Sequence, residues 1–359
     1  MTKTEICKNS GRSKRFFCVK CGNTISIAEG SGCMEKWTKN VLLGSSLAAV
    51  GIGMAGAVHA VTTRYLVDVA LNRQPPRHTE KAGRKLSGSQ LDGLWMRRRM
   101  ECGQRLRNMG GERVETAGRG QVRLVGHWFE TEGAKRVMVA MHGWRSSWCN
   151  DFGFIVDFWL ENGCSVLMAE QRGQGESGGE YMGFGLLERH DCLSWVNWIN
   201  ARCGKQMPVY LCGVSMGAST VLMAAGLELP QNVRGIIADC GYTSPEAIWR
   251  HVAKDNLGLS YGTRRGAVNG ICRKRIKMGI GDYSCLDALT ECEVPVLFIH
   301  GTDDRFVPIE MTYENYKVCA GPKRLFVVPG AGHGMSYCVD TPGYQKAMKQ
   351  FWEEFDMGR

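Results

Sequence analysis

The chain has 359 residues, 44% of them hydrophobic and 22% charged, which fits one large folded domain with a tail or two ordinary domains. This composition excludes a disordered chain, and 46 glycines without a three-residue period exclude a collagen-like one. The net charge of +10 is compatible with binding to nucleic acid, with binding to an anionic membrane surface or with solubility alone, and it does not distinguish these three possibilities.

Residues 1–40 are polar and basic and are predicted to form a disordered leader. They contain one Cys-x-x-Cys pair, Cys18 and Cys21, whereas a structural zinc site needs four ligands. We therefore interpret these cysteines as incidental and predict no metal. Many of the 16 cysteines, such as Cys164 and Cys212, occupy positions expected to be buried, which indicates reduced thiols rather than a disulfide framework.

Residues 41–61 form an apolar run without a charged side chain, about the length of a helix that crosses a bilayer. The run predicts a transmembrane or signal-anchor helix. The alternatives are a buried core helix, or a cleaved signal peptide if translation starts at Met34. Basic residues are more crowded before the run than after it, which favours a large domain outside the membrane, with a cytoplasmic domain as the alternative.

Residues 62–111 are expected to be a basic connector, and Leu91, Leu94 and Trp95 suggest a helix within it that lies over the following domain. The charges suit an anionic lipid surface or an ordinary solvated face. Nucleic acid is not predicted, because no finger, basic-zipper or RNP pattern accompanies the charge.

Residues 112–359 alternate short apolar segments with amphipathic helices, which predicts an α/β fold with a mostly parallel sheet and helices on both faces. Residues 244–286 interrupt this alternation and are too long for a plain crossover, so we expect an inserted helical cap. The expected strands are 122–130, 137–141, 164–169, 209–212, 233–240, 296–300 and 324–328, and the expected helices are 154–160, 187–200, 216–225, 311–319 and 341–355.

The segment Gly213-Val214-Ser215-Met216-Gly217 lies between an expected strand and an expected helix. In that context the pattern is typical of a nucleophile elbow, in which a sharp turn exposes the serine Oγ at the start of a helix. Gly213 and Gly217 are needed because neighbouring backbone passes too close for a Cβ. The spacing therefore predicts Ser215 as a nucleophile.

A serine nucleophile needs a base, and a carboxylate that orients the base, normally in the chain order Ser, Asp, His. His333 lies in a glycine-rich loop directly after an expected strand, from which it can reach Ser215. The loop after the preceding strand contains Asp303 and Asp304. We predict Asp304 as the orienting acid, with Asp303 as the alternative.

An oxyanion intermediate requires preorganised N–H donors. The backbone of Met216, next after the nucleophile, and that of Trp144, in the loop after strand 137–141, are the predicted donors. A dinucleotide fingerprint is matched by spacing at Gly173, Gly175 and Gly178, but no helix start and no later acid support it. We therefore predict no cofactor.

These residues resemble the α/β-hydrolase superfamily of serine hydrolases over about residues 112–355. The motifs that carry the resemblance are HGW at 142–144, RGQGESGG at 172–179, GVSMG at 213–217, HGTDDRFVP at 300–308 and GAGHGMS at 330–336. The resemblance implies an eight-stranded sheet, a cap after the sixth strand and esterase-type activity without a cofactor. More narrowly, the chain is similar to membrane-anchored hydrolases of Gram-positive bacteria with an aminopeptidase-like or feruloyl-esterase-like domain. Glu170, where many relatives have Asp, and the cysteine-rich leader depart from the pattern.

The expected protein is thus a single-pass, membrane-anchored serine hydrolase that cleaves small or acyl esters or thioesters through an acyl-enzyme. The expected partners are a small-molecule ester and a bacterial membrane, without nucleic acid. A peptidase on the same fold and a non-catalytic interaction domain are the alternatives. The predicted cap is basic, which favours neutral or anionic substrates over the free amine of a peptide; its basic residues are Arg264, Arg265, Arg273, Lys274 and Arg275.

Overall fold

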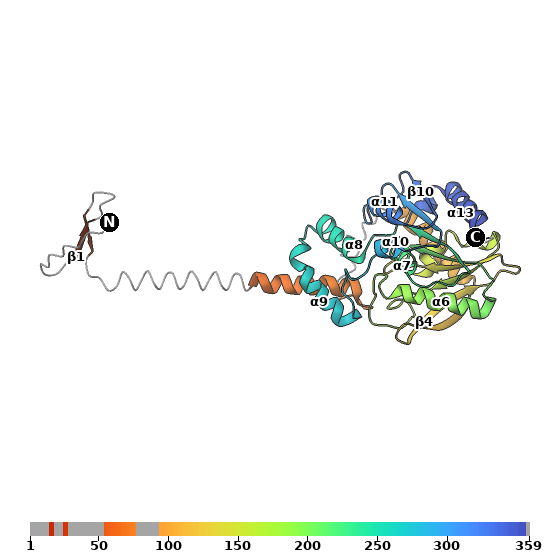
Figure 1. The fold of residues 1–359 in the computed structure, drawn as a ribbon, viewed down its shortest axis with the longest axis horizontal. Coiled ribbons are helices and arrows are strands. Elements are labelled where there is room, and N and C mark those ends of the chain that lie inside the picture. Colours follow the sequence, from red (N-terminus) through yellow and green to blue (C-terminus); the bar gives the residue numbers. More distant parts are fainter. Residues whose placement is uncertain (1–13, 18–23, 28–53, 77–92, 357–359) are drawn as a thin grey trace. The chain divides into compact units, whose positions relative to one another are not determined.

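The computed structural model describes residues 14–17, 24–27, 54–76 and 93–356, and the chain divides into two units, Met1–Val61 and Thr62–Arg359. In the first unit, β1 (Lys14–Phe17) and β2 (Thr24–Ile27) pair as an antiparallel two-stranded sheet (Figure 1). Sequence reasoning did not predict these strands. Cys18 and Cys21 lie outside the described residues.

The predicted membrane helix, residues 41–61, lies mostly outside the described residues, which resume at Met54. Residues 54–71 are helical. Across the described part of the chain, no helix combines the length and the apolar character that a membrane crossing requires.

The second unit is built on an eight-stranded sheet in the order β10-β9-β8-β7-β5-β6-β4-β3, as expected for the predicted fold. β4 pairs antiparallel with both β3 and β6, and the other neighbouring strands are parallel. β3 was not among the strands expected from the sequence. The strands are β3 (Glu112–Gly118), β4 (Val122–Phe129), β5 (Arg136–Met141), β6 (Cys164–Ala169), β7 (Val209–Val214), β8 (Val233–Asp239), β9 (Val296–Gly301) and β10 (Lys323–Val328).

Buried apolar side chains cover both faces of this sheet. Along β5, Val137, Val139 and Met141 belong to one buried cluster, and Met138 and Ala140 belong to the other. This alternation follows from the two-residue period of a strand, and it explains why the central strands consist of continuous apolar runs. The helices on the first face include α6 (Glu188–Cys203), α7 (Met216–Ala224), α10 (Cys285–Thr290) and α11 (Ile309–Val318), and those on the second include α3 (Gly93–Asn108), α4 (Trp148–Phe152), α5 (Val156–Glu161) and α13 (Thr341–Phe355).

The expected helical cap follows β8, the sixth strand of the large sheet in chain order. It comprises α8 (Pro245–His251), the π-helical turn η1 (Val252–Asn256), the 3₁₀ turn η2 (Gly262–Arg264) and α9 (Arg265–Ile276). Ser244 begins the cap because its hydroxyl accepts a hydrogen bond from the N–H of Ala247 at 3.0 Å, which caps the first turn of α8. Figure 1 shows these helices gathered at one end of the domain.

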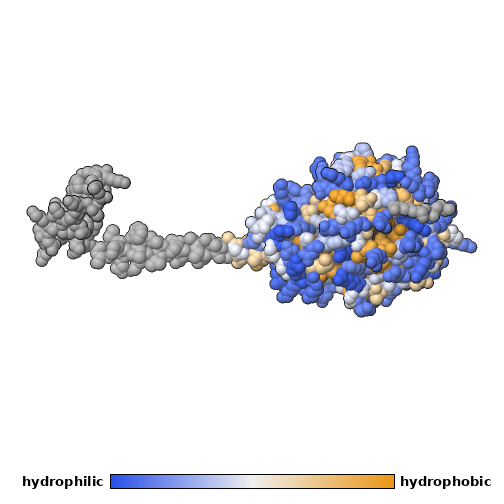
Figure 2. Space-filling model, viewed as in Figure 1, coloured by the Kyte–Doolittle hydropathy of each residue, from blue (hydrophilic) through white to orange (hydrophobic). Residues whose placement is uncertain are grey.

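The parts of the expected connector that the structure describes, residues 62–76 and 93–111, belong to the second unit. Residues 62–71 are helical, with Val67 and Leu71 almost fully buried in the cluster that contains α6 and α7. Asn72 then forms a bridge with Tyr181, and α3 follows after residues that lie outside the described part. The prediction of a connector was based on charge content, whereas the apolar residues at helical spacing decide where this segment packs. Figure 2 shows mainly polar and charged side chains on the visible face of the domain, with apolar patches between them.

The glycine-rich loop after β6 is held by an ion pair and by hydrogen bonds within the domain. Arg172 and Asp191 form a buried bidentate ion pair, with Nε and Nη2 lying 2.6 and 2.5 Å from the carboxylate oxygens. The departure at Glu170 changes local hydrogen bonding, because its carboxylate accepts from His127 Nε2 at 2.9 Å and from the N–H of Glu176.

Replacing Asp191 by alanine should leave the Arg172 guanidinium buried without its counter-charge. We expect Asp191→Ala to lower the free energy of unfolding by about 3–5 kcal/mol, measured by urea denaturation. Asp157→Ala is the matched control, because Asp157 forms an exposed ion pair with Arg105 that should contribute less than about 1 kcal/mol. Equal losses in the two variants would contradict a special role for the buried pair.

Candidate active site

The turn between β7 and α7 holds Ser215 in a strained conformation. Its φ of 57° and ψ of −118° are values that residues with a Cβ rarely adopt. A Cβ on Gly213 would overlap the backbone of Gly217, and a Cβ on Gly217 would overlap the carbonyl oxygen of Met141. The two glycines of the motif therefore allow the turn to close against β5 and to present the Ser215 hydroxyl.

Three side chains from three loops meet at the carboxyl end of the sheet. Nε2 of His333 lies 2.8 Å from Oγ of Ser215, and Nδ1 of His333 lies 2.7 Å from Oδ2 of Asp304. Asp303, the alternative acid, is exposed and accepts a hydrogen bond from the Thr302 hydroxyl at 2.9 Å. The structure therefore connects Asp304, and not Asp303, to the histidine.

Close backbone packing sets the spacing of the two loops that carry the acid and the histidine. A Cβ on Gly301, the last residue of β9, would overlap the carbonyl of Ala331, two residues before His333. The N–H of Asp303 donates to the same carbonyl at 3.0 Å. These contacts hold Asp304 and His333 at hydrogen-bonding distance.

The Asp304 carboxylate is fully buried and accepts four hydrogen bonds. The N–H groups of Phe306 and Val307 each donate to Oδ1 at 2.9 Å, and His300 Nε2 lies 3.2 Å from Oδ2, to which His333 also donates. Burial alone would raise the pKa of Asp304, but the two histidines lower it far more, through charge and hydrogen bonding. Asp304 therefore stays ionised beside His333.

The electrostatics of His333 suit a general base. Burial opposes a positive charge on the ring, but the Asp304 carboxylate raises the pKa of His333 above the ordinary value for histidine. With Nδ1–H donating to Asp304, Nε2 is left to accept the proton of the Ser215 hydroxyl. The arrangement can therefore move a proton from the serine to the imidazole and stabilise the resulting cation.

The two predicted oxyanion donors belong to two segments that border the serine, the start of α7 and the loop after β5. Met216 begins α7, so its N–H is one of the four that a helix leaves without an intrahelical partner. Trp144 follows Gly143, whose added Cβ would stand 3.4 Å from the Cβ of Ser215. The Trp144 N–H thus comes from a loop in contact with the nucleophile, as expected from its position after β5.

A buried carboxylate that sequence reasoning missed holds this loop. Asp151 accepts from the N–H of Gly143 at 2.7 Å and from the Ser146 hydroxyl at 2.6 Å, and it forms an ion pair with Arg99 of α3. Burial alone would raise the pKa of Asp151, but Arg99 and these hydrogen bonds lower it. No motif signals Asp151, because its partners lie in two separate segments of the chain.

Cys240, Asp304 and His333 offer possible ligand atoms within 4.8 Å of one another, a spacing that could in principle hold a metal ion. The imidazole and the carboxylate of this group already hydrogen bond to each other. Burial also raises the pKa of Cys240 well above its ordinary value, and a metal binds the thiolate rather than the thiol. The environment of these three residues therefore suits proton transfer better than metal binding.

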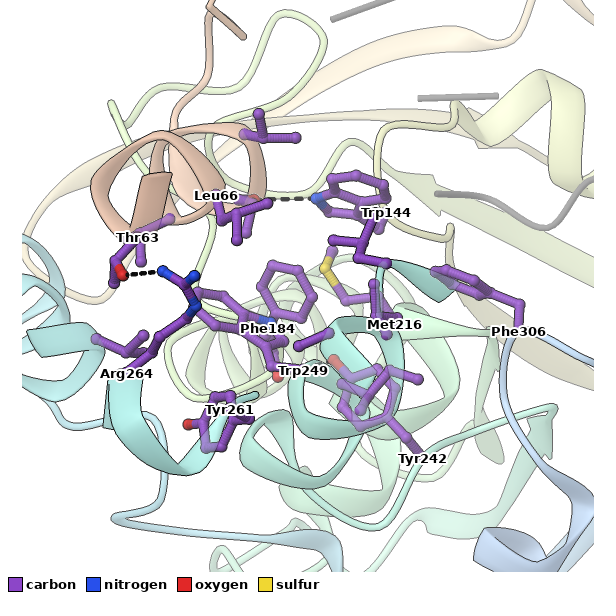
Figure 3. A pocket seen from close by; sticks show the side chains of 18 of the residues that line it. Thr63, Leu66, Trp144, Phe184, Met216, Tyr242, Trp249, Tyr261, Arg264 and Phe306 are labelled. Carbon is purple, nitrogen blue, oxygen red and sulfur yellow. Dashed lines mark hydrogen bonds between the residues drawn. The ribbon is translucent and has the colours of Figure 1, made fainter. Parts of the chain in front are cut away.

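An apolar pocket, partly open to solvent, is lined in part by Ser215. Figure 3 shows this pocket from close by. It is called the Ser215 pocket below. Its lining includes Thr63, Leu66, Val67, Val69, Ala70, Trp144, Phe184, Ser215, Met216, Tyr242, Ile248, Trp249, Val252, Ala253, Leu257, Tyr261, Arg264, Val268 and Phe306.

Four of the five basic residues that the sequence places in the cap have partners within the domain. Arg265 pairs with Glu246, Arg273 pairs with Asp282 at 2.6 Å, and the Arg264 guanidinium donates to the Thr62 and Thr63 hydroxyls at 3.0 and 2.7 Å. Arg275 forms an ion pair with Asp68. Arg265 and Arg273 nevertheless remain exposed, so the expectation that the basic cap favours neutral or anionic substrates stays a prediction.

The mostly parallel eight-stranded sheet, the cap after the sixth strand and the serine on the β7–α7 turn together define the α/β-hydrolase fold. Residues 132–257, about a third of the chain, match the family model described as serine aminopeptidase, S33.

Individual relatives share this region at low identity. Uncharacterized protein YqkD of Bacillus subtilis (strain 168) is 28% identical over 223 residues, which are 61% of this chain and 72% of YqkD. Uncharacterized protein YfhR of Escherichia coli O157:H7 is 25% identical over 177 residues, and the match spans 55% of YfhR. Among solved structures, an esterase of Pyrococcus furiosus superposes with a TM-score of 0.57 at 21% identity, over 68% of this chain and 91% of the esterase. At that identity the likeness shows the fold.

Asp239 is buried at the end of β8, and its raised pKa should make the free energy of unfolding depend on pH. Burial raises its pKa from 3.8 to about 6, although Ser336 donates to its carboxylate at 2.9 Å. Because the folded-state pKa is raised, this group favours folding below pH 3.8 and destabilises the fold as the pH rises through about 6. We expect Asp239→Asn to be more stable than the wild type, by a margin that grows to roughly 3 kcal/mol between pH 4 and pH 7.5.

Urea unfolding of both proteins across this pH range measures that margin. Asp303→Asn is the matched control, because it removes a neighbouring carboxylate that is exposed. A margin for Asp239→Asn that does not change with pH would contradict the assignment.

Proposed function

We propose that the protein is a serine hydrolase that cleaves carboxylic ester or thioester bonds through an acyl-enzyme. The observation that carries the proposal is the unbroken hydrogen-bonded path from the Ser215 hydroxyl through both nitrogens of His333 to the buried carboxylate of Asp304. The strained Ser215 backbone and the adjacent N–H groups of Met216 and Trp144 support the same chemistry.

In the acylation step, Ser215 Oγ attacks the substrate carbonyl carbon while Nε2 of His333 takes the hydroxyl proton. Asp304 holds the ring through Nδ1–H and stabilises the imidazolium. The negative charge that develops on the carbonyl oxygen is stabilised by the N–H groups of Met216 and Trp144. Collapse of the tetrahedral intermediate breaks the bond to the leaving group, which receives its proton from Nε2.

In the deacylation step, a water molecule takes the place of the leaving group beside His333. Nε2 removes a proton from the water, and the hydroxide attacks the acyl carbon. The second tetrahedral intermediate collapses to release the carboxylic acid and to return the proton to Ser215. Because Asp304 raises the pKa of His333, the neutral base becomes abundant at a higher pH than it would for an ordinary histidine.

A peptidase is the second candidate, suggested by the description of the matched family model. An aminopeptidase must compensate the ammonium group of its substrate, and buried charges need a partner of opposite sign. None of the described residues that line the Ser215 pocket is an aspartate or a glutamate. This lining favours an ester or thioester over a peptide with a free α-amine. A non-catalytic interaction domain is favoured less, because it has no need for the connected triad.

Membrane anchoring is a separate part of the proposal, supported by the apolar run at residues 41–61. We expect the full chain to stay with bacterial membranes after an alkaline carbonate wash and to be released by detergent. Protease treatment of intact protoplasts should then degrade the hydrolase domain if it lies outside. Recovery of the full chain in the soluble fraction would contradict the anchor.

Ser215→Ala should remove both ester hydrolysis and covalent labelling by a fluorophosphonate probe. We expect a loss of at least about 10³-fold in kcat/KM for p-nitrophenyl butyrate, because the nucleophile acts as a unit with its base. The matched control is Ser194→Ala on α6, where the hydroxyl donates to the carbonyl of His190 at 3.3 Å, and this variant should keep wild-type activity and labelling. Residual labelling of Ser215→Ala would show that another residue is the nucleophile.

A further inference from the structure

The outer wall of the Ser215 pocket comes from a segment that precedes the sheet in the sequence. Leu66, Val67 and Ala70 line the pocket from the helix of residues 62–71, and Ile248 and Trp249 line it from the cap. Figure 3 shows Leu66 and Thr63 on this helix across the cavity from Tyr242 and Met216. The pocket is therefore enclosed by two elements that lie outside the strands of the sheet.

Hydrogen bonds fix the helix of residues 62–71 to the oxyanion loop. Trp144 Nε1 donates to the carbonyl of Ala70 at 3.0 Å, and the Arg145 guanidinium donates to the carbonyls of Val69 and Asn72 at 2.7 and 2.6 Å. The backbone N–H of Trp144 is also the predicted oxyanion donor. Trp144 and Arg145 of the oxyanion loop are thus bonded directly to the helix that forms the wall of the pocket.

The cap holds the same helix from the other side. Arg275 of α9 pairs with Asp68 and donates to the Asn72 side chain at 3.1 Å. Arg264 donates to the Thr63 hydroxyl at 2.7 Å. These contacts attach residues 62–71 to the cap as part of the wall of the pocket, with Leu66 facing the cavity.

The lining of the pocket selects against charge. Arg264 is the one charged residue among the described lining residues, and its guanidinium is directed to the Thr62 and Thr63 hydroxyls. An ammonium or carboxylate in this apolar space would lose its hydration without a paired charge. An apolar chain would instead gain from burial, by up to about 4-fold in kcat/KM for each methylene.

The position of the pocket relative to the triad indicates which half of an ester it receives. The leaving group must lie next to His333, which protonates it, whereas the acyl part remains on Ser215 beside the oxyanion donors. Ser215 and the two predicted oxyanion donors, Met216 and Trp144, line the pocket, and Phe306, which also lines it, packs its ring against that of His333 with the centroids 4.9 Å apart. The residues that hold the acyl group are thus part of the cavity wall, which favours the acyl side of the scissile bond for this pocket.

We propose that the Ser215 pocket binds an uncharged, apolar acyl chain longer than acetyl, and that the helix of residues 62–71 determines this specificity through Leu66. The inference rests on the proposed ester hydrolase function and adds the substrate class. It assigns a specificity role to a segment whose sequence suggests only a basic connector.

The test compares p-nitrophenyl acetate, butyrate and octanoate, each below the concentration at which the ester aggregates. For the full-length wild type we expect kcat/KM to rise at least about tenfold from acetate to octanoate. Leu66→Asp should lower the octanoate-to-acetate ratio by about tenfold or more, and the milder Leu66→Gln should lower it less. Tyr65→Asp is the matched control, because Tyr65 is the neighbouring residue on the same helix and is exposed, and it should keep the wild-type ratio.

Fluorophosphonate labelling and thermal unfolding of each variant show whether its active site is folded. A wild type that cleaves all three esters equally would overturn the acyl-chain inference while leaving the hydrolase proposal intact. A fall in the ratio with Tyr65→Asp as large as with Leu66→Asp would also overturn it. A preference for octyl acetate over ethyl acetate, without a preference among acyl chains, would assign the pocket to the leaving group. Absence of hydrolysis and of labelling in the wild type would instead reject the proposed function.

Discussion

The close approach of α7 to β5 is the constraint on which the site depends. Gly217 lies against the carbonyl of Met141 with no space for a Cβ, and this contact lets the β7–α7 turn hold Ser215 at a positive φ. The same turn brings the unbonded N–H at the start of α7 next to the nucleophile. The strain at Ser215 is tolerated because the residues around it, in β5, β7 and α7, are almost completely buried and packed on both faces of the sheet.

Two buried carboxylates near the site keep their charge because each accepts hydrogen bonds from several donors. Asp304 accepts from two backbone N–H groups and two histidines, and Asp151 accepts from a backbone N–H, a hydroxyl and an arginine. Both therefore stay ionised although buried, one to orient His333 and the other to hold the oxyanion loop. Asp239 is the contrast, because its fewer donors leave its pKa raised to about 6.

The helix of residues 62–71 changes how the N-terminal part of the chain is understood. Its basic surroundings suggested a connector, but Arg275 and Arg145 bind it to the cap and to the oxyanion loop. Its apolar side chains then complete a pocket that the nucleophile also lines. A change in this segment can therefore alter the substrate-binding space without touching the triad.

Local patterns in the sequence were sufficient for seven of the eight strands of the large sheet, the cap, the elbow at Ser215 and the histidine of the hydrogen-bonded path. Each of these rests on residues close together in sequence, such as the glycines two positions either side of Ser215 or the loop directly after β10. Only the tertiary structure decided between Asp303 and Asp304, revealed Asp151 and His300, and gave residues 62–71 a place in the pocket. Those outcomes depend on contacts between distant segments, such as the contact between Arg275 and Asp68, which are 207 residues apart. The periodicity of residue types along the sequence does not indicate such pairs.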